Sequence, residues 1–122
     1  MSWTPARIRS FIISGLRSTA SRWPPKYETL KAAFVGKKIN AASGREAKHY
    51  LCAHYEWEFP SSKVQVDHIN PVVDPKVGFT TWDTFIDRLF CTEEGLQVLC
   101  STCHKKKTEQ ERKERNASKH SS

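Results

Sequence analysis

Two cysteines and a histidine lie close together near the C-terminal end of the sequence, as Cys100-Ser-Thr-Cys103-His104. This C-x-x-C-H pattern is the one through which c-type haem is attached to proteins. The same residues could form half of a zinc-binding knuckle, or begin a helix that carries a catalytic metal ligand. The choice among the three interpretations depends on what the rest of the chain supplies.

The start of the chain and its methionine content disfavour haem. Three arginines interrupt the apolar residues of positions 1–20, so no export signal is visible, and no apolar run is long enough to cross a membrane. We therefore expect a cytoplasmic protein with reduced cysteines, which bind metal more often than they form disulfides. Covalent haem attachment belongs to exported proteins and commonly requires a distal methionine or histidine, but the only methionine is Met1.

A carboxylate and a further imidazole are supplied by Asp67 and His68. Apolar and polar residues alternate over positions 64–68, which predicts a strand whose Asp67 and His68 side chains point to opposite faces. His104 begins the predicted C-terminal helix. A divalent ion held by Asp67 and His104 would leave positions for phosphate oxygens and water. His68, which titrates near neutrality, could remove a proton from that water.

The remaining elements must position these residues, and their pattern predicts an α+β fold. Thr4-Pro5 is a typical helix start, and apolar residues recur behind it at helical spacing. The further elements expected are a helix from Pro24-Pro25 to Gly36, a hairpin of strands at 49–59 and 63–69, a helix at 80–90, a strand at 95–100, and a helix from about 102 that ends in a disordered tail at 116–122.

The 122-residue chain carries a formal net charge of +7, which is unevenly distributed. Residues 1–50 hold ten Lys/Arg and two acidic residues, residues 51–100 hold three and eight, and residues 101–122 hold seven and three. Basic ends around an acidic centre suit a protein that binds a polyanion and keeps carboxylates for a metal, although they can also serve solubility alone. The candidate nucleic-acid-binding residues are Arg7, Arg17, Arg22, Lys37, Lys38, Lys105, Lys106 and Lys107.

Three segments together resemble a known enzyme family. They are YLCAHYEWEF, VQVDHINPV and LFCTEEGLQVLCSTCHKKKT, which lie between Tyr50 and Thr108 and cover about half of the chain. They are similar to the HNH endonucleases, the ββα-metal nucleases, and especially to small phage-encoded members of the homing type. The resemblance implies a ββα-metal nuclease domain with a structural zinc site at 49–108. The residues outside it predict a basic helical arm at 1–48, which could instead simply pack under the core, and a charged helix end with a disordered tail at 109–122.

The same resemblance implies roles for individual residues. His68 corresponds to the general base, and Asp67 and His104 correspond to the ligands of a catalytic divalent ion, Mg²⁺ or Mn²⁺. Cys100 and Cys103 correspond to the second cysteine pair of a structural Zn²⁺ site. The implied substrate is double-stranded DNA, in the cytoplasm of a bacterial host if the protein is phage-encoded.

The sequence departs from the family pattern where an asparagine normally precedes the Leu-Gln of the last strand. Gly95 occupies that position. Glycine has no amide side chain with which to hold the loop that carries the general base. Gln97 or Asn70 are the residues that could compensate.

A second departure lies in the first cysteine pair. A C-x-x-C motif that starts at Cys52 would end at position 55, where this chain has Tyr55. His54 is the tentative replacement ligand, although Cys-x-His is tighter than the usual two-residue spacer. Cys91 is the other candidate ligand, although it could instead be an ordinary buried thiol without a metal.

The sequence therefore predicts a metal-dependent DNA endonuclease that hydrolyses phosphodiester bonds. The alternative from another class is a zinc-stapled DNA-binding module with a decayed HNH active site, which the residues at positions 55 and 95 favour. A further alternative is a protein whose basic helices bind an acidic protein partner.

Overall fold

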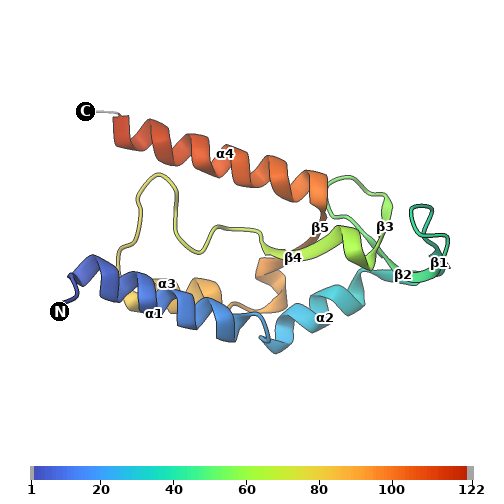
Figure 1. The fold of residues 1–122 in the computed structure, drawn as a ribbon, viewed down its shortest axis with the longest axis horizontal. Coiled ribbons are helices and arrows are strands. Elements are labelled where there is room, and N and C mark those ends of the chain that lie inside the picture. Colours follow the sequence, from blue (N-terminus) through green and yellow to red (C-terminus); the bar gives the residue numbers. More distant parts are fainter. Residues whose placement is uncertain (1, 121–122) are drawn as a thin grey trace.

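The computed structural model describes residues 2–120, and for 119 and 120 it describes the backbone alone. Within this range the chain is a mixed α+β protein with four α-helices and two small sheets (Figure 1). The elements are α1 (Pro5–Ala20), α2 (Pro24–Ala32), β1 (Phe34–Ile39), β2 (Glu46–Leu51), β3 (Glu58–Pro60), η1 (Ser61–Lys63), β4 (Val64–His68), α3 (Trp82–Leu89), η2 (Glu93–Gly95), β5 (Leu96–Cys100) and α4 (Ser101–His120).

The two N-terminal helices begin where the sequence predicts. Thr4 caps α1, because its hydroxyl accepts a hydrogen bond from the backbone N–H of Arg7 at 3.1 Å. The second helix ends earlier than expected, at Ala32, and the expected end at Gly36 lies within strand β1. Gly36 has φ 136, a backbone conformation incompatible with a helix, and it adjoins an irregularity in the pairing of β1 with β2.

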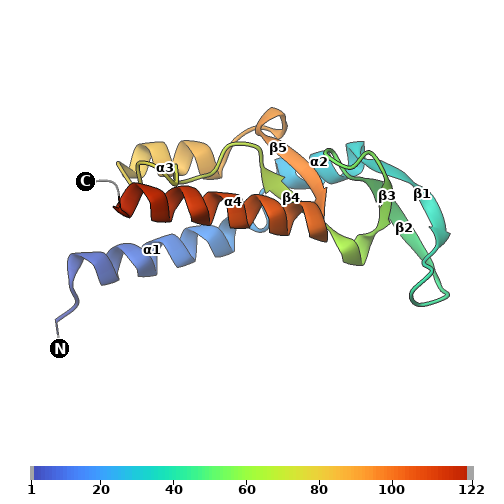
Figure 2. The same ribbon diagram turned by 90° about the horizontal axis from the view of Figure 1, so that it is seen from above.

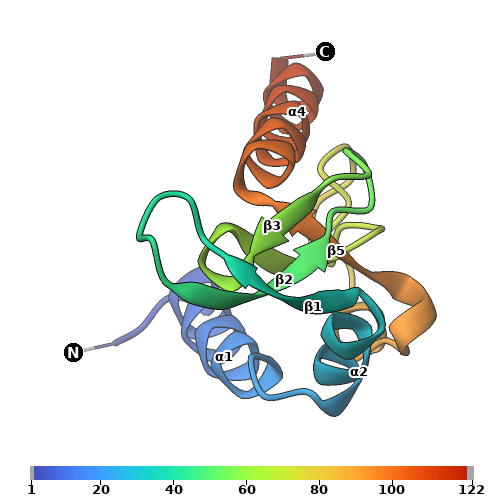
Figure 3. The ribbon, with the colours of Figure 1, turned by 90° about the vertical axis from the view of Figure 1, so that its right-hand side faces the viewer.

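The strand pairing differs from the predicted hairpin, which was wrong. The first sheet has the order β1-β2-β3, with antiparallel pairs (Figure 3). Strand β4 pairs with β5 rather than with the segment before it, and Asp67 lies opposite Gln97. The short helical turn η1 separates β3 from β4, so the chain leaves the first sheet before β4 starts. The pairing of β4 therefore depends on a strand that arrives only after the following loop and α3.

Helix α4 follows β5 without a connecting loop and lies on the opposite side of the β4–β5 pair from α1, α2 and α3 (Figures 1 and 3). It continues to His120 where a disordered tail was expected from residue 116, and Ser121 and Ser122 lie outside the described residues. Polar contacts support the helix: Gln110 donates to Glu114, and Ser118 donates from its hydroxyl to the carbonyl of Lys76 at 2.6 Å.

One hydrophobic cluster joins α1 to α3. Its buried residues are Ala20, Val72, Phe85 and Leu89. The guanidinium of Arg17 lies 5.7 Å from the Phe85 ring centre, which adds a cation–π contact between the same two helices. Figure 2 shows α1 and α3 running along the same end of the molecule. No helix in residues 2–120 is long and apolar enough to cross a membrane.

Candidate metal centres

Three cysteines from separate parts of the fold meet in the interior. Cys52 follows β2, Cys100 ends β5, and Cys103 lies in the first turn of α4. Their sulfur atoms all lie within 4.8 Å of one another, and all three residues are buried. Leu99 belongs to the same cluster, and Phe59 packs against it.

Backbone N–H groups point at two of these sulfurs. Cys52 Sγ accepts from the N–H of Cys100 at 3.3 Å and from that of Tyr55 at 3.5 Å. Cys100 Sγ accepts from the N–H of Cys103 at 3.4 Å. Burial by itself raises the pKa of the Cys52 thiol, but the N–H donors of Cys100, Tyr55 and His54 outweigh it and leave the pKa below its ordinary value.

Three thiolates in this space require a cation. Burial and the neighbouring sulfurs of Cys100 and Cys52 raise the pKa of Cys103 to about 12, so a third negative charge is unfavourable in the cluster on its own. A bound metal ion removes that penalty, and an all-sulfur set is typical of soft or borderline metals such as zinc. The three cysteines therefore fit a metal ion.

Neither tentative fourth ligand belongs to this group. Among the described residues, the group of close metal-binding side chains consists of the three cysteines, without His54 or Cys91. His54 is exposed. Cys91 packs elsewhere: its carbonyl accepts from Trp23 Nε1 at 2.6 Å, and a Cβ added to Gly95 would lie 3.0 Å from its sulfur.

A second polar cluster lies between β4 and α4. Asp67 Oδ1 and His104 Nε2 are 4.0 Å apart, as expected for two side chains that share an ion. Asp67 Oδ2 is buried, and the ammonium group of Lys107 lies 2.8 Å from it. The structure thus brings together the two predicted ligands of the divalent ion.

Lys107 is the unexpected member of this second cluster. Its Nζ lies 2.8 Å from Asp67 Oδ2 and donates to the carbonyl of His68 and to Glu111 Oε1, each also at 2.8 Å. Burial alone would lower the pKa of Lys107, but Asp67 and Glu111 raise it above its ordinary value. Sequence reasoning assigned Lys107 to DNA phosphates and missed Glu111, although the i,i+4 spacing of the two residues is a signal for an ion pair.

The His68 ring forms its hydrogen bond with α3 and not with that cluster. Its Nε2 lies 3.0 Å from the carbonyl oxygen of Leu89, and a carbonyl can only accept, so Nε2 carries the hydrogen. Nδ1 of the neutral ring is then the nitrogen with the free lone pair. Burial, more than any other cause, lowers the pKa of His68 and keeps the ring neutral at pH 7. No hydrogen bond joins the His68 ring to Asp67 or His104 within residues 2–120.

The loop after His68 is held by backbone groups. Ile69 donates its N–H to the carbonyl of Gly95 at 2.9 Å, so the glycine that replaces the expected asparagine still holds this loop. Gln97 pairs with Asp67 across the two strands, and Asn70 is exposed. This bond uses only the main chain of residue 95, so it does not replace an amide side chain, and within residues 2–120 the side chains of Gln97 and Asn70 form no hydrogen bond to the loop.

The basic residues predicted to bind DNA are mostly exposed. Four already contact protein groups: Arg7 lies over the Trp3 ring at 4.4 Å, Arg17 lies over Phe85, Lys38 pairs with Glu58, and Lys107 pairs with Asp67 and Glu111. The exposed members are Arg7, Arg17, Arg22, Lys37, Lys38, Lys105 and Lys106. An open groove of about 340 Å³ adjoins the second cluster, and it is lined by His104, Lys105, Thr108, Glu109 and Arg112.

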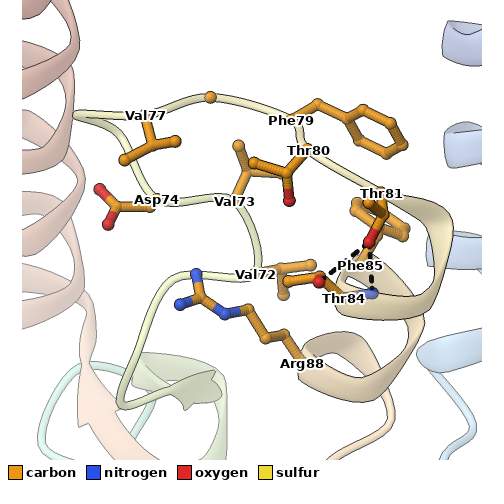
Figure 4. A pocket seen from close by; sticks show the side chains of 11 residues that line it. Val72, Val73, Asp74, Val77, Phe79, Thr80, Thr81, Thr84, Phe85 and Arg88 are labelled. Carbon is orange, nitrogen blue, oxygen red and sulfur yellow. Dashed lines mark hydrogen bonds between the residues drawn. The ribbon is translucent and has the colours of Figure 1, made fainter.

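A separate cavity of about 120 Å³ lies beneath the loop that leads into α3. Figure 4 shows its lining, with Val72, Val73 and Phe85 around it and dashed lines from Thr81 to Thr84 at the helix start. Its volume is small, and none of the predicted site residues lines it. This cavity is therefore a packing feature and not a candidate site.

Comparisons of the chain with protein-family models, with curated proteins and with solved structures gave no match.

Proposed function

We propose that this protein is a metal-dependent endonuclease that hydrolyses DNA phosphodiester bonds, with a core of the ββα-metal type. The observation that carries the proposal is the approach of Asp67 on β4 to His104 on α4, at 4.0 Å. A carboxylate and an imidazole at this distance form half of a typical site for a hydrolytic divalent ion.

Asp67 and His104 would hold the divalent ion, Mg²⁺ or Mn²⁺. When bound, the ion would stabilise negative charge on the phosphate and on the leaving oxygen. Lys107 holds the Asp67 carboxylate and the His68 carbonyl in fixed positions, since its Nζ lies 2.8 Å from an oxygen of each.

His68 would remove the proton from the attacking water through Nδ1. The Leu89 carbonyl fixes the tautomer by accepting from Nε2, and it also stabilises the imidazolium that forms after proton transfer. The lowered pKa of His68 keeps the base in its neutral, active form at physiological pH.

DNA would bind beside His104 through its phosphate backbone. Lys105 and Arg112 line the groove at this histidine and could contact phosphates on either side of the scissile bond. The exposed arginines of α1 and the lysines of β1 would extend the contact along the duplex.

The three-cysteine cluster would bind zinc and stabilise the fold. Its cysteines join the end of β2 to β5 and to the start of α4. Since that start carries His104, zinc would also keep the proposed catalytic ligand in position.

Incubation of purified protein with supercoiled plasmid tests the proposal. We expect nicked or linear DNA with Mg²⁺ or Mn²⁺ and none with a chelator. His68→Ala should slow cleavage by about 10²–10⁴-fold while DNA affinity stays nearly unchanged. Absence of cleavage by the wild-type protein under every divalent ion would contradict an endonuclease.

One observation favours a DNA-binding module without activity as a second candidate function. The ammonium group of Lys107 lies 2.8 Å from Asp67 Oδ2, so an internal cation already neutralises the carboxylate. Tight DNA binding by a protein that neither cuts nor binds Mn²⁺ at Asp67 would support this candidate.

A further inference from the structure

The turn that follows Cys52 reproduces the geometry found between the other two cysteines. Cys103 donates its N–H to Cys100 Sγ at 3.4 Å, three residues along the chain, and Tyr55 donates its N–H to Cys52 Sγ at 3.5 Å with the same spacing. The turn is completed by Glu56, whose N–H donates to the Cys52 carbonyl at 2.9 Å and whose φ is 55. Tyr55 therefore occupies the position that corresponds to Cys103, as the second residue of a metal-binding turn.

Tyr55 does not direct a ligand atom at the cluster. Its ring contacts Phe59 edge to face, with centres 6.2 Å apart, and the residue is 60% exposed. Phe59 itself packs against the cysteines. The turn supplies the sulfur of Cys52 and leaves its second ligand position empty.

A cavity adjoins the cluster on this side. It has a volume of about 610 Å³ and is lined by Cys103, His54, Tyr55, Pro71, Lys106, Lys107, Gln110, Glu111 and Glu114. The charged residues of the lining are two lysines and two glutamates, and Lys107 is already paired with Asp67 and Glu111. The cavity has room for a small molecule next to Cys103.

We propose that the cluster binds zinc through Cys52, Cys100 and Cys103 alone, and that its fourth coordination position faces this cavity and takes an exchangeable external ligand. Water would occupy the position in the resting protein, and a small nitrogen donor or thiol would replace it. Closed four-ligand sites are structural, whereas sites with three protein ligands leave a position for exchange. This inference rests on the zinc site of the proposed function, but it is independent of DNA cleavage.

Cobalt substitution tests the proposal with the full-length protein. Co²⁺ reports its ligand set through visible absorption, so the wild-type protein should bind one Co²⁺ per chain, and added imidazole should shift its visible bands. Tyr55→Cys, at an exposed position, should add a thiolate. In this variant the sulfur-to-cobalt charge-transfer absorbance per bound Co²⁺ should be higher than in wild type, and added imidazole should no longer change the spectrum.

Two further variants complete the design. Tyr55→Phe keeps the ring on Phe59 and should behave as wild type, which makes it the matched control for Tyr55→Cys. His54→Ala should leave the cobalt spectrum and its imidazole response unchanged. A spectrum altered by His54→Ala would identify His54 as the fourth ligand and overturn the proposal.

The remaining outcomes separate this inference from the proposals on which it rests. Wild-type protein that binds one Co²⁺ but does not respond to imidazole would overturn the open position and leave the metal site intact. Protein that binds no Co²⁺ would overturn both the open position and the zinc site. Plasmid cleavage is scored separately, so a nuclease without an open zinc position and an open position without nuclease activity give different results.

Discussion

Lys107 Nζ and Asp67 Oδ2 lie 2.8 Å apart, at the place where a divalent ion would approach the carboxylate. The side chains are 19% and 18% exposed, so the pair is shielded from water on most sides. A cation built into the chain therefore competes with any metal for this oxygen. The pair also connects β4 to α4, because Lys107 donates at the same time to the carbonyl of His68.

Replacement of Lys107 by methionine separates its two effects. Asp67 and Glu111 would lose their shared cation, and leaving such groups unpaired should lower the free energy of unfolding by about 1–3 kcal/mol in the metal-free protein. Mn²⁺ should bind more tightly, because it no longer competes with an ammonium group. Urea unfolding and Mn²⁺ titration measure the two quantities.

Lys106→Met is the matched control for that variant, since Lys106 is the exposed neighbour on the same helix. It should change neither the stability nor the Mn²⁺ affinity. Weaker Mn²⁺ binding in Lys107→Met than in wild type would show that the lysine supports the metal site and does not compete with the ion.

Asparagine at position 95 is expected to be poorly tolerated in this chain. A Cβ there would lie 3.0 Å from Cys91 Sγ and 3.3 Å from its Cβ, so Gly95→Asn should overpack the contact and cost about 1–3 kcal/mol. The loop that follows His68 is also already bonded to residue 95 through the main chain, from the Ile69 N–H to the Gly95 carbonyl. The double variant Cys91→Ala/Gly95→Asn should recover much of the lost stability.

A double-mutant cycle on these two positions measures the coupling directly. Thermal unfolding of the wild type, both single variants and the double variant supplies the four values. Additive effects would show that Cys91 is not what limits the residue at position 95.

The rate of DNA cleavage should stay high as the pH is lowered to 6.5, the ordinary pKa of imidazole, and should fall only below it. Burial lowers the pKa of His68, so the base loses its function only when the pH falls through that lowered value. Cleavage rates measured from pH 5 to 8 under saturating Mg²⁺ test this expectation. An acid limb above pH 6.5 would contradict the assignment of His68 as the base.

The lowered pKa of His68 also makes the free energy of unfolding depend on pH. The folded pKa of His68 lies below the unfolded value, so the unfolded chain binds more protons in the interval between them. The contribution of neutral His68 to stability is thus fully present above the unfolded pKa and is lost as the pH falls through the folded pKa. Urea unfolding of wild type and His68→Gln at pH 7.5 and 5 should show a smaller pH dependence in the variant.

The groove beside His104 should contribute to the salt dependence of DNA binding. Lys105→Ala with Arg112→Ala should reduce the log–log slope by about 0.9 for each phosphate that the variant no longer binds. Lys63→Ala with Lys76→Ala is the control, because both residues are exposed and lie away from the groove. Equal slopes for the two double variants would exclude the groove as a phosphate-binding surface.

Charge removal is a better test here than deletion of residues 1–48. Those residues include β1 and the start of β2, and Ala20 is 1% exposed within the main hydrophobic cluster. A truncated chain would expose this cluster and lose one sheet edge. Weaker DNA binding after truncation would therefore report unfolding rather than the removal of basic side chains from the DNA-binding surface.

Local signals in the sequence predicted the elements better than their pairing. The cap at Thr4 and the alternation before His68 predicted a helix start and a strand, and both are present. The partner of β4 could not be predicted, because β5 arrives only after a loop and α3, and no local pattern encodes that approach. Adjacent strands were the simplest expectation, and the turn η1 made it wrong.

The candidate sites divide in the same way. The gathering of Cys52, Cys100 and Cys103 was expected from cysteine spacing together with the HNH resemblance, and it is present in the structure. The sequence already indicated that Tyr55 stands where the first cysteine pair would end, but the N–H bond of Tyr55 to Cys52 Sγ and its ring contact with Phe59 were not predictable from it. The position of Lys107 depends on the register between α4 and β4, which the sequence does not encode locally.

The direct continuation of β5 into α4 places Cys103 and His104 next to each other in one helical turn, directed at two different clusters. Successive residues of a helix are rotated by about 100° from each other, so a single rigid turn orients one ligand toward the sulfurs and the next toward Asp67. An ion bound to Cys103 would fix the orientation of this turn and so restrict the positions open to His104, and an ion bound to His104 would do the same for Cys103. Occupancy of the two sites would then be thermodynamically linked, with each ion raising the affinity for the other by the same factor.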